Sequence, residues 1–161
     1  MDARFNRMKK LLAALAAAVA ISPAGASPVL VGTWVSSHDL TMAFVKDHAR
    51  VEDRTEIFLD QMMGRLTMRF DGSNVTYSLP DWDAQIQGKH QRIVGFNEHS
   101  KYTVLFSNDT TVVIQGRQPV TGKDVVTIYN FIDDNTMWAY QGSADKAMPD
   151  LNIREYFVRV K

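Results

Sequence analysis

Short strand-like segments separated by turn residues make up the chain from Gly64 to its C-terminus. Over 66–70 and 74–79, apolar residues alternate with polar ones, which is typical of strands with one buried face. Asp71-Gly72-Ser73 between them has the composition of a tight turn, so the two segments form a hairpin. Strands at regular intervals form an antiparallel meander that closes into a barrel or folds into a sandwich. Further strands are expected at 91–96, 102–106, 110–115, 124–132, 136–141 and 152–160, with polar connections at 80–88 and 97–100.

The segment before Gly64 has a different, helical pattern. An opening strand is expected at 30–37, and from 38 to 63 apolar residues recur three and four positions apart. Gly64 is a typical helix stop. The sequence therefore predicts one or two short helices, separated around 49–53, between the first strand and the second.

The N-terminus has the features of a secretion signal. Residues 1–10 carry four basic side chains, 11–21 are all apolar, and Ala24-Gly25-Ala26 supplies small residues for a cleavage site. As a helix the apolar run spans only about 16 Å, too short to cross a hydrocarbon core about 30 Å thick, which argues against a membrane anchor. We expect a cleaved signal peptide, 1–26, and a single domain, 27–161, that is periplasmic or secreted without stable membrane insertion.

Charge and cysteine content exclude several classes of protein. Residues 1–26 carry four of the 18 Lys and Arg and one of the 18 Asp and Glu, so 27–161 holds 14 basic and 17 acidic residues, a net charge of about −3. This balance gives no electrostatic reason to bind nucleic acid. The chain has no cysteine, which excludes disulfides, lipid attachment at a cysteine, thiol catalysis and thiolate metal sites.

The opening of the first strand, Gly32-Thr33-Trp34, suggests a relationship. Followed by the helical section and the hairpin around Asp71-Gly72, it resembles the start of the calycin group, the lipocalins and fatty-acid-binding proteins. Proteins of this group begin with a Gly-x-Trp strand and run as an up-and-down barrel around an apolar cavity. The resemblance implies a lipocalin-like antiparallel β-barrel of eight or nine strands, closed at one end by Trp34. Export is expected from the signal segment instead, whose compact, alanine-rich form is typical of a bacterial protein.

The last strand carries the first candidate binding residues. Arg154-Glu155-Tyr156 is similar to the Arg-x-Tyr with which many fatty-acid-binding proteins hold a carboxylate. Strand alternation places Arg154 and Tyr156 on one face with two valines, and this face is expected to point into the barrel. An internal guanidinium needs a partner, which is either a ligand carboxylate or an internal acid such as Asp81 or Asp83, unless it lies at the barrel rim.

Three more residues complete the candidate ligand-binding set. Met62 and Met68 belong to a group of methionines in the helical section and the strand after it, where their adaptable side chains would line a ligand entrance or fill the core. Tyr77 lies in the predicted hairpin.

Catalytic motifs are absent from the sequence. It has no Gly-x-Ser-x-Gly, no His-Glu-x-x-His and no glycine-rich phosphate loop, so no catalytic residue is assigned. His90 and His99 match no common metal-ligand spacing and are expected to lie in solvated loops, so we predict neither a metal nor a cofactor.

The sequence therefore favours an exported protein that binds a small hydrophobic or amphipathic ligand, possibly with a carboxylate, inside the barrel. One alternative is a non-enzymatic envelope or protein-interaction module with a filled barrel and a protein partner. Another is a small hydrolase or isomerase that uses cavity residues. A continuous apolar void of a few hundred Å³, about 300 Å³ or more, inside the barrel would favour the first over the second.

Cleavage after Ala26 is directly testable. N-terminal sequencing of exported protein should begin at Ser27, because Ala24 and Ala26 are the small residues that a signal peptidase recognises. Exported protein that begins at Met1 would contradict the assignment.

Overall fold

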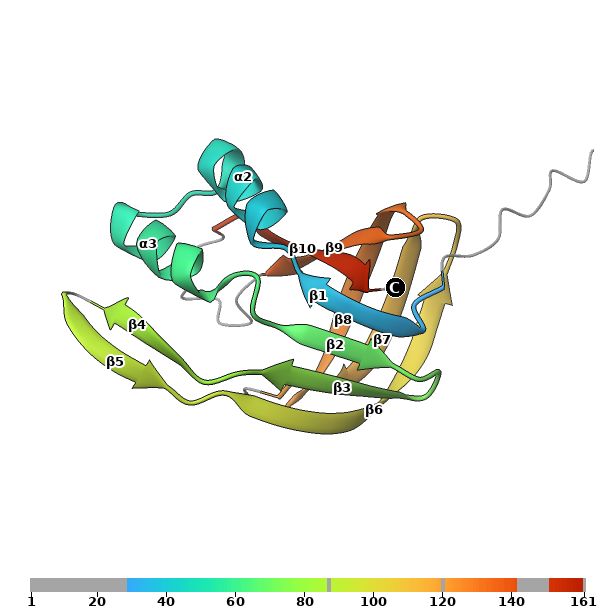
Figure 1. The fold of residues 1–161 in the computed structure, drawn as a ribbon. Coiled ribbons are helices and arrows are strands. Elements are labelled where there is room, and N and C mark those ends of the chain that lie inside the picture. Colours follow the sequence, from blue (N-terminus) through green and yellow to red (C-terminus); the bar gives the residue numbers. More distant parts are fainter. Residues whose placement is uncertain (1–28, 87, 120, 142–150, 161) are drawn as a thin grey trace, which may run out of the picture.

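The computed structural model describes residues 29–86, 88–119, 121–141 and 151–160, and it shows a closed antiparallel β-barrel with two helices (Figure 1). Eight strands form the barrel, and both helices lie between its first and second strands. The predicted fold class is therefore confirmed.

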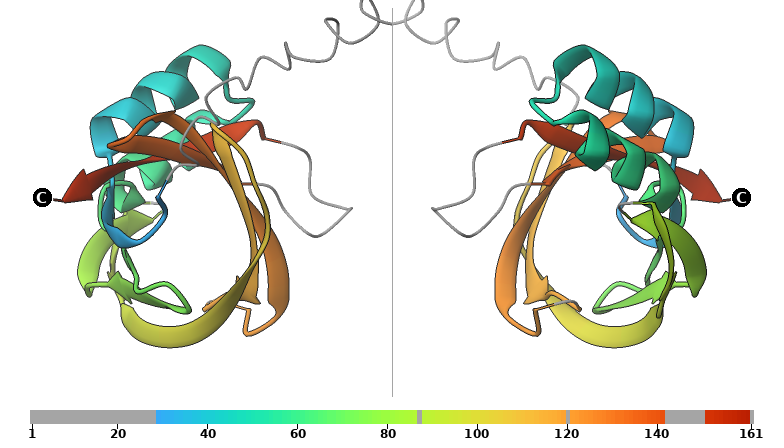
Figure 2. Two further views of the ribbon diagram at one scale, coloured as in Figure 1. Left: turned by 90° about the vertical axis from the view of Figure 1, so that its right-hand side faces the viewer. Right: turned by 90° about the vertical axis from the view of Figure 1, so that its left-hand side faces the viewer.

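The barrel closes because its first strand pairs with its last. β1 pairs with β2 on one side and with β10 on the other, and all strand pairs are antiparallel. Figure 2 looks along the barrel and shows the ring of strands with the helices along one side. Around the ring, the strands are β1 (Gly32–Ser36), β10 (Ile153–Val160), β9 (Thr136–Gln141), β8 (Asp124–Asp133), β7 (Thr111–Arg117), β6 (Phe96–Ser107), β3 (Asn74–Leu79) and β2 (Thr67–Phe70).

The helical section contains two helices, α2 (His38–His48) and α3 (Asp53–Met62), with the predicted break between them. The Ser37 hydroxyl accepts a hydrogen bond from the Leu40 N–H and caps α2. Gly64 follows α3 with a φ of 85°, a left-handed conformation that favours glycine and ends the helix as predicted. No helix within the described ranges is both long and apolar enough to cross a lipid bilayer.

The helices pack on the barrel through a small core of their own. Met42 and Val45 of α2 and Leu59 of α3 are buried together with Met63 and with Ile153 of β10. This cluster is separate from the main core inside the barrel. The two helices therefore form a layer over the first residues of β10.

Two sequence predictions about strands are wrong. The segment 80–88 was expected to be a connection, but it contributes β4 (Trp82–Ile86), which pairs with β5 (Lys89–Ile93) in a hairpin outside the barrel (Figure 1). The expected turn at 97–100 is part of the long strand β6, whose first half pairs with β3 and whose second half pairs with β7. In both cases pairing between strands outweighs the polar character of the local sequence.

One end of the barrel is closed by Trp34, whose side chain is fully buried. Its indole N–H donates to the Leu30 carbonyl oxygen over 2.8 Å, and its ring meets the edge of Phe131 with centroids 5.7 Å apart. The guanidinium carbon of Arg159, directly opposite Trp34 on β10, lies 4.2 Å from the ring centroid. Gly32 has a φ of 134°, which L side chains rarely adopt, and an added Cβ would also lie 2.6 Å from a nitrogen of the same guanidinium, so glycine is favoured there. The expected role of Trp34 as a plug is confirmed.

The plug predicts a large loss of stability on truncation. Trp34→Ala should lower the free energy of unfolding by about 3–5 kcal/mol, because it leaves a cavity among well-packed aromatic rings. Val126→Ala on the outer wall, where the side chain is 58% exposed, is the control and should cost less than about 1 kcal/mol. Denaturant titrations in which the two variants unfold at similar midpoints would contradict the assignment.

Candidate functional site

A cavity of about 160 Å³ lies inside the barrel. Its position follows from the size of side chains in successive rows across three strands. Phe131, Met137 and Phe157 occupy paired positions on β8, β9 and β10 and fill one row with large side chains. In the next row, Tyr129 and Glu155 both pair with Ala139, which is too small to fill the space between them.

The described residues around the cavity are mostly apolar or aromatic, and none of them is charged. They are Leu66, Met68, Tyr77, Phe96, Gln118, Pro119, Val125, Thr127, Tyr129, Ala139, Tyr140, Gln141 and Phe157. An apolar cavity with a few polar groups directed at it is the usual form of a small-molecule site.

Two tyrosine hydroxyls form the first polar group of the cavity. The hydroxyls of Tyr77 and Tyr129 are hydrogen-bonded to each other, and the Tyr129 hydroxyl donates to Sδ of Met68 over 3.6 Å. Burial raises the pKa of Tyr77, and it raises the pKa of Tyr129 well above its usual range. Both phenols are therefore neutral groups that donate and accept hydrogen bonds.

Glu155 is not among the residues that line the cavity, but it lies in the same row as Tyr129 and Ala139, which do. Only 7% of the residue is exposed, and its carboxylate accepts hydrogen bonds from the Gln141 amide, over 2.8 Å, and from the Ser36 hydroxyl. The Ser36 oxygen in turn accepts the Gly64 N–H over 3.0 Å. Burial raises the pKa of Glu155, and the two hydrogen bonds oppose this effect.

The structure contradicts the expected direction of Arg154 and Tyr156. Alternation along β10 puts Glu155 and Phe157 on the inner face, so Arg154 and Tyr156 lie on the outer face of the barrel. The guanidinium carbon of Arg154 lies 4.1 Å from the ring centroid of Trp138 and 4.8 Å from that of Phe44 on α2. The Tyr156 ring also approaches Phe44, with centroids 6.1 Å apart.

The cause of this error lies in the valines at the end of the strand. Val158 and Val160 share a face with Arg154, and their apolar character favoured that face as the inner one, but they are 36% and 50% exposed. Nor does Arg154 use the internal acids proposed as partners, since Asp81 and Asp83 lie 3.2 and 3.5 Å from Arg92 nitrogens.

The remaining predicted residues divide between the cavity and the helical core. Met68 and Tyr77 line the cavity, whereas Met62 is half-buried at the end of α3 and packs on the cluster beneath the helices. Sequence reasoning missed Glu155 and Ala139. Ile153 and Phe157, which are larger than the valines, share a face with Glu155 and were the available indication that this face is the inner one.

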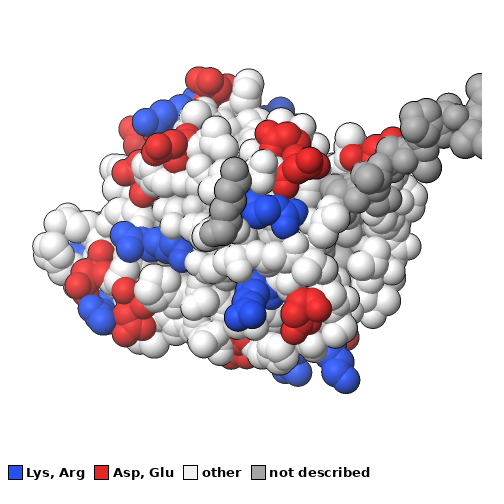
Figure 3. Space-filling model, turned by 45° about the vertical axis from the view of Figure 1, so that its right-hand side comes forward, with Lys and Arg blue, Asp and Glu red and all other residues white. Residues whose placement is uncertain are grey.

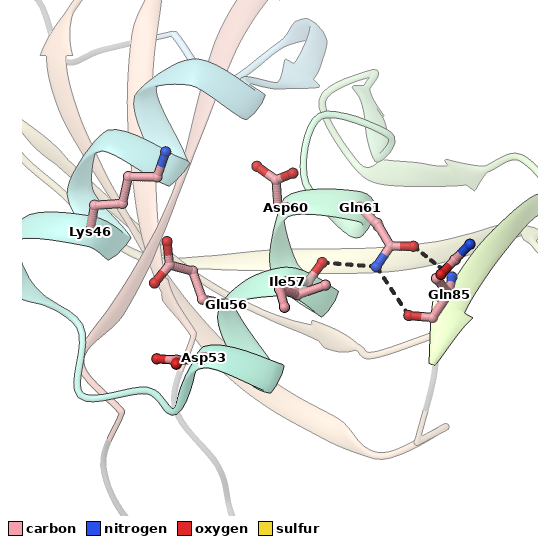
Figure 4. Close-up of a pocket in the computed structure, with 7 residues that line it drawn as sticks. All are labelled: Lys46, Asp53, Glu56, Ile57, Asp60, Gln61 and Gln85. Atoms are coloured by element: carbon pink, nitrogen blue, oxygen red, sulfur yellow. Dashed lines mark hydrogen bonds between the residues drawn. The ribbon is translucent and has the colours of Figure 1, made fainter. Parts of the chain in front are cut away.

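A larger hollow of about 560 Å³ lies outside the barrel, between the helices and β4 (Figure 4). The Gln61 side chain links α3 to β4 across this hollow. Its amide nitrogen donates to the carbonyl oxygens of Ile57 and Gln85 over 2.9 and 3.2 Å, and its amide oxygen accepts the Gln85 N–H over 2.6 Å. Lys46 and three acidic side chains of α3 surround it, and Ile57 is 58% exposed. We regard this open groove as the joint between α3 and the β4–β5 hairpin, because enclosure and apolar lining favour the internal cavity as the binding site.

The described residues offer no metal site. Among the described residues, no three His, Asp or Glu side chains come together in a way that would hold a metal ion. His90 and His99, which were expected in loops, lie in β5 and β6.

Comparisons with protein-family models, curated proteins and solved structures find no match, so the functional argument rests on the cavity itself.

The buried carboxyl predicts a specific dependence of stability on pH. Because the folded state raises the pKa of Glu155 above its ordinary value of 4.5, the folded protein binds this proton more tightly than the unfolded chain does. The contribution of Glu155 to stability is therefore fully present below pH 4.5 and is lost as the pH rises through the folded pKa.

Glu155→Gln removes this titration. The difference in unfolding free energy between variant and wild type should shift in favour of the variant as the pH rises from about 4 to 8, which denaturant titrations across that range would measure. A difference that stays constant with pH would show that the folded state does not raise the pKa of Glu155.

Proposed function

We propose that this protein binds a small hydrophobic or amphipathic molecule in the barrel cavity. The observation that carries the proposal is the row formed by Tyr129, Ala139 and Glu155, in which the small Ala139 leaves space beside two polar side chains, next to a cavity that is partly open to solvent. Such a site supplies apolar surface for the body of a ligand and hydrogen bonds for its polar end.

The size of the cavity limits the ligand. An apolar cavity of about 150 Å³ in a protein core holds one benzene ring. At about 160 Å³, this cavity is smaller than the void of about 300 Å³ expected for the binding hypothesis. It fits a single ring or a short chain without rearrangement, and a long acyl chain would have to extend out of it. A carboxylate on the ligand has no support from Arg154, whose guanidinium lies on the outer face between two aromatic rings.

We further propose that the chain is a lipocalin-like exported protein, periplasmic or secreted. The closed barrel with Gly32 and Trp34 in its first strand and helices before its second supports the lipocalin-like assignment. Residues 1–26, the basis for export, lie outside the described residues.

Protein interaction is the second candidate function, and exposed apolar side chains on the outer wall favour it. Phe106 pairs with Val113, which pairs with Ile128, and Phe106 and Ile128 are 52% and 49% exposed. On the face shown in Figure 3, basic and acidic side chains are interspersed, and no continuous basic surface for nucleic acid appears there. The outer wall would become the leading candidate if the cavity binds nothing.

The enzyme alternative has less support. Glu155 is the one carboxylate placed in the same row as the described cavity residues, and those lining residues include no histidine that would act with it as a general acid or base.

Filling the cavity tests the proposed function. Toluene and benzyl alcohol, both of single-ring size, should bind the wild-type protein saturably in calorimetric titration. Ala139→Leu should abolish the binding of both, because the added side chain occupies the space between Tyr129 and Glu155, while destabilising the fold by only about 1–3 kcal/mol.

Arg154→Met on the outer face is the matched control and should bind both probes like wild type. Lack of binding by the wild-type protein, or undiminished binding by a folded Ala139→Leu variant, would refute the proposal.

A further inference from the structure

Glu155 gives the barrel interior a charge preference that the apolar cavity lining does not reveal. The residue lies in the same row as Tyr129 and Ala139, which both line the cavity, and Phe157 on the same face of β10 lines it as well. None of the described Lys, Arg or His side chains forms an ion pair with it. A buried carboxylate without a cation is costly unless another group supplies the missing charge.

The present donor to Glu155 can be replaced by a ligand. Gln141 lies at the end of β9, is exposed as a residue, lines the cavity and reaches Glu155 with its amide nitrogen at 2.8 Å. A ligand group that enters the cavity can take this position, because Gln141 can rotate toward solvent. The Ser36 hydroxyl, which is tied to the Gly64 N–H, would stay in place and hold the carboxylate in its orientation.

We propose that the cavity selects a small amine with an apolar body, whose ammonium group pairs with Glu155 in place of the Gln141 amide. This inference rests on the proposed function and names the class of ligand that the same site takes.

The surroundings of Glu155 can satisfy an ammonium group. Its three N–H donors require acceptors, which the Glu155 carboxylate and the tyrosine hydroxyl oxygens would provide. A ligand carboxylate would meet a like charge instead, and no described residue lining the cavity carries a positive charge to offset it. The order of affinity expected for ligands with one ring is therefore amine, then alcohol, then carboxylate.

Four probes of the same ring size separate these effects: benzylamine, benzyl alcohol, toluene and benzoate. In calorimetric titrations at pH 7 with the full protein, benzylamine should bind at least about tenfold more tightly than benzyl alcohol, and benzoate more weakly than either, because hydrogen bonds to charged groups are stronger than neutral ones. Glu155→Gln should weaken benzylamine binding by about ten- to a hundredfold and change benzyl alcohol binding by less than about threefold.

Two further variants cover the case in which Glu155→Gln does not fold. Glu155→Asp keeps the charge and should keep the preference for the amine over the alcohol. Gln141→Ala removes the competing amide at an exposed position, so it should preserve or increase that preference.

The two proposals fail in different ways. If none of the four probes binds, the proposed function is wrong. If toluene and benzyl alcohol bind but benzylamine binds no more tightly than the alcohol, or if folded Glu155→Gln retains the preference for the amine, the cavity is a binding site and the inference about amines is overturned.

Discussion

The contact between Trp34 and Arg159 joins the two ends of the folded chain, and the rest of the barrel depends on it. The two residues face each other on the first and last strands, with the guanidinium carbon 4.2 Å from the ring centroid. Arg159 also donates to the backbone carbonyl oxygens of Val29, Val31 and Asp134. The buried Trp34 and the partly exposed Arg159 therefore reinforce the β1–β10 pairing that closes the ring, and Arg159 fixes the segment that leads into it.

The closed end explains why the space for a ligand lies farther along the barrel. Next to Trp34, rows of Phe and Met side chains fill the interior, and only at the level of Ala139 does the packing leave a cavity. Beyond this level the helices supply a second core and Gly64 binds Ser36, so the buried Glu155 lies at the boundary between two apolar clusters. The carboxylate is thus held by the fold in the row of Ala139, beside the cavity.

Much of this architecture could be predicted from the sequence because it depends on local patterns. Period-two alternation identified most strands, helical spacing with Gly64 identified the helices, and the Gly-x-Trp opening identified the plug. The β4–β5 hairpin and the first half of β6 were missed, because their polar residues form strands through pairing with distant partners. The direction of β10 was also misjudged: alternation separates the two faces of a strand, but packing against α2, β1 and β9 decides which face is buried. Because the wrong face of β10 was taken as the inner one, Glu155 was missed as a candidate residue. No sequence pattern marks a buried acid whose hydrogen-bond donors are neutral.

The central claim is that ligands enter the barrel at the row of Ala139, and methyl NMR of the methionines tests it most directly. Met68 lines the cavity, whereas Met42 and Met63 are buried in the separate core beneath the helices. With signals assigned by Met→Leu substitution, titration with benzyl alcohol should shift the Met68 methyl resonance saturably and leave those of Met42 and Met63 nearly unchanged. Saturable shifts confined to Met42 and Met63, with Met68 unaffected, would place the site among the helices and contradict the account.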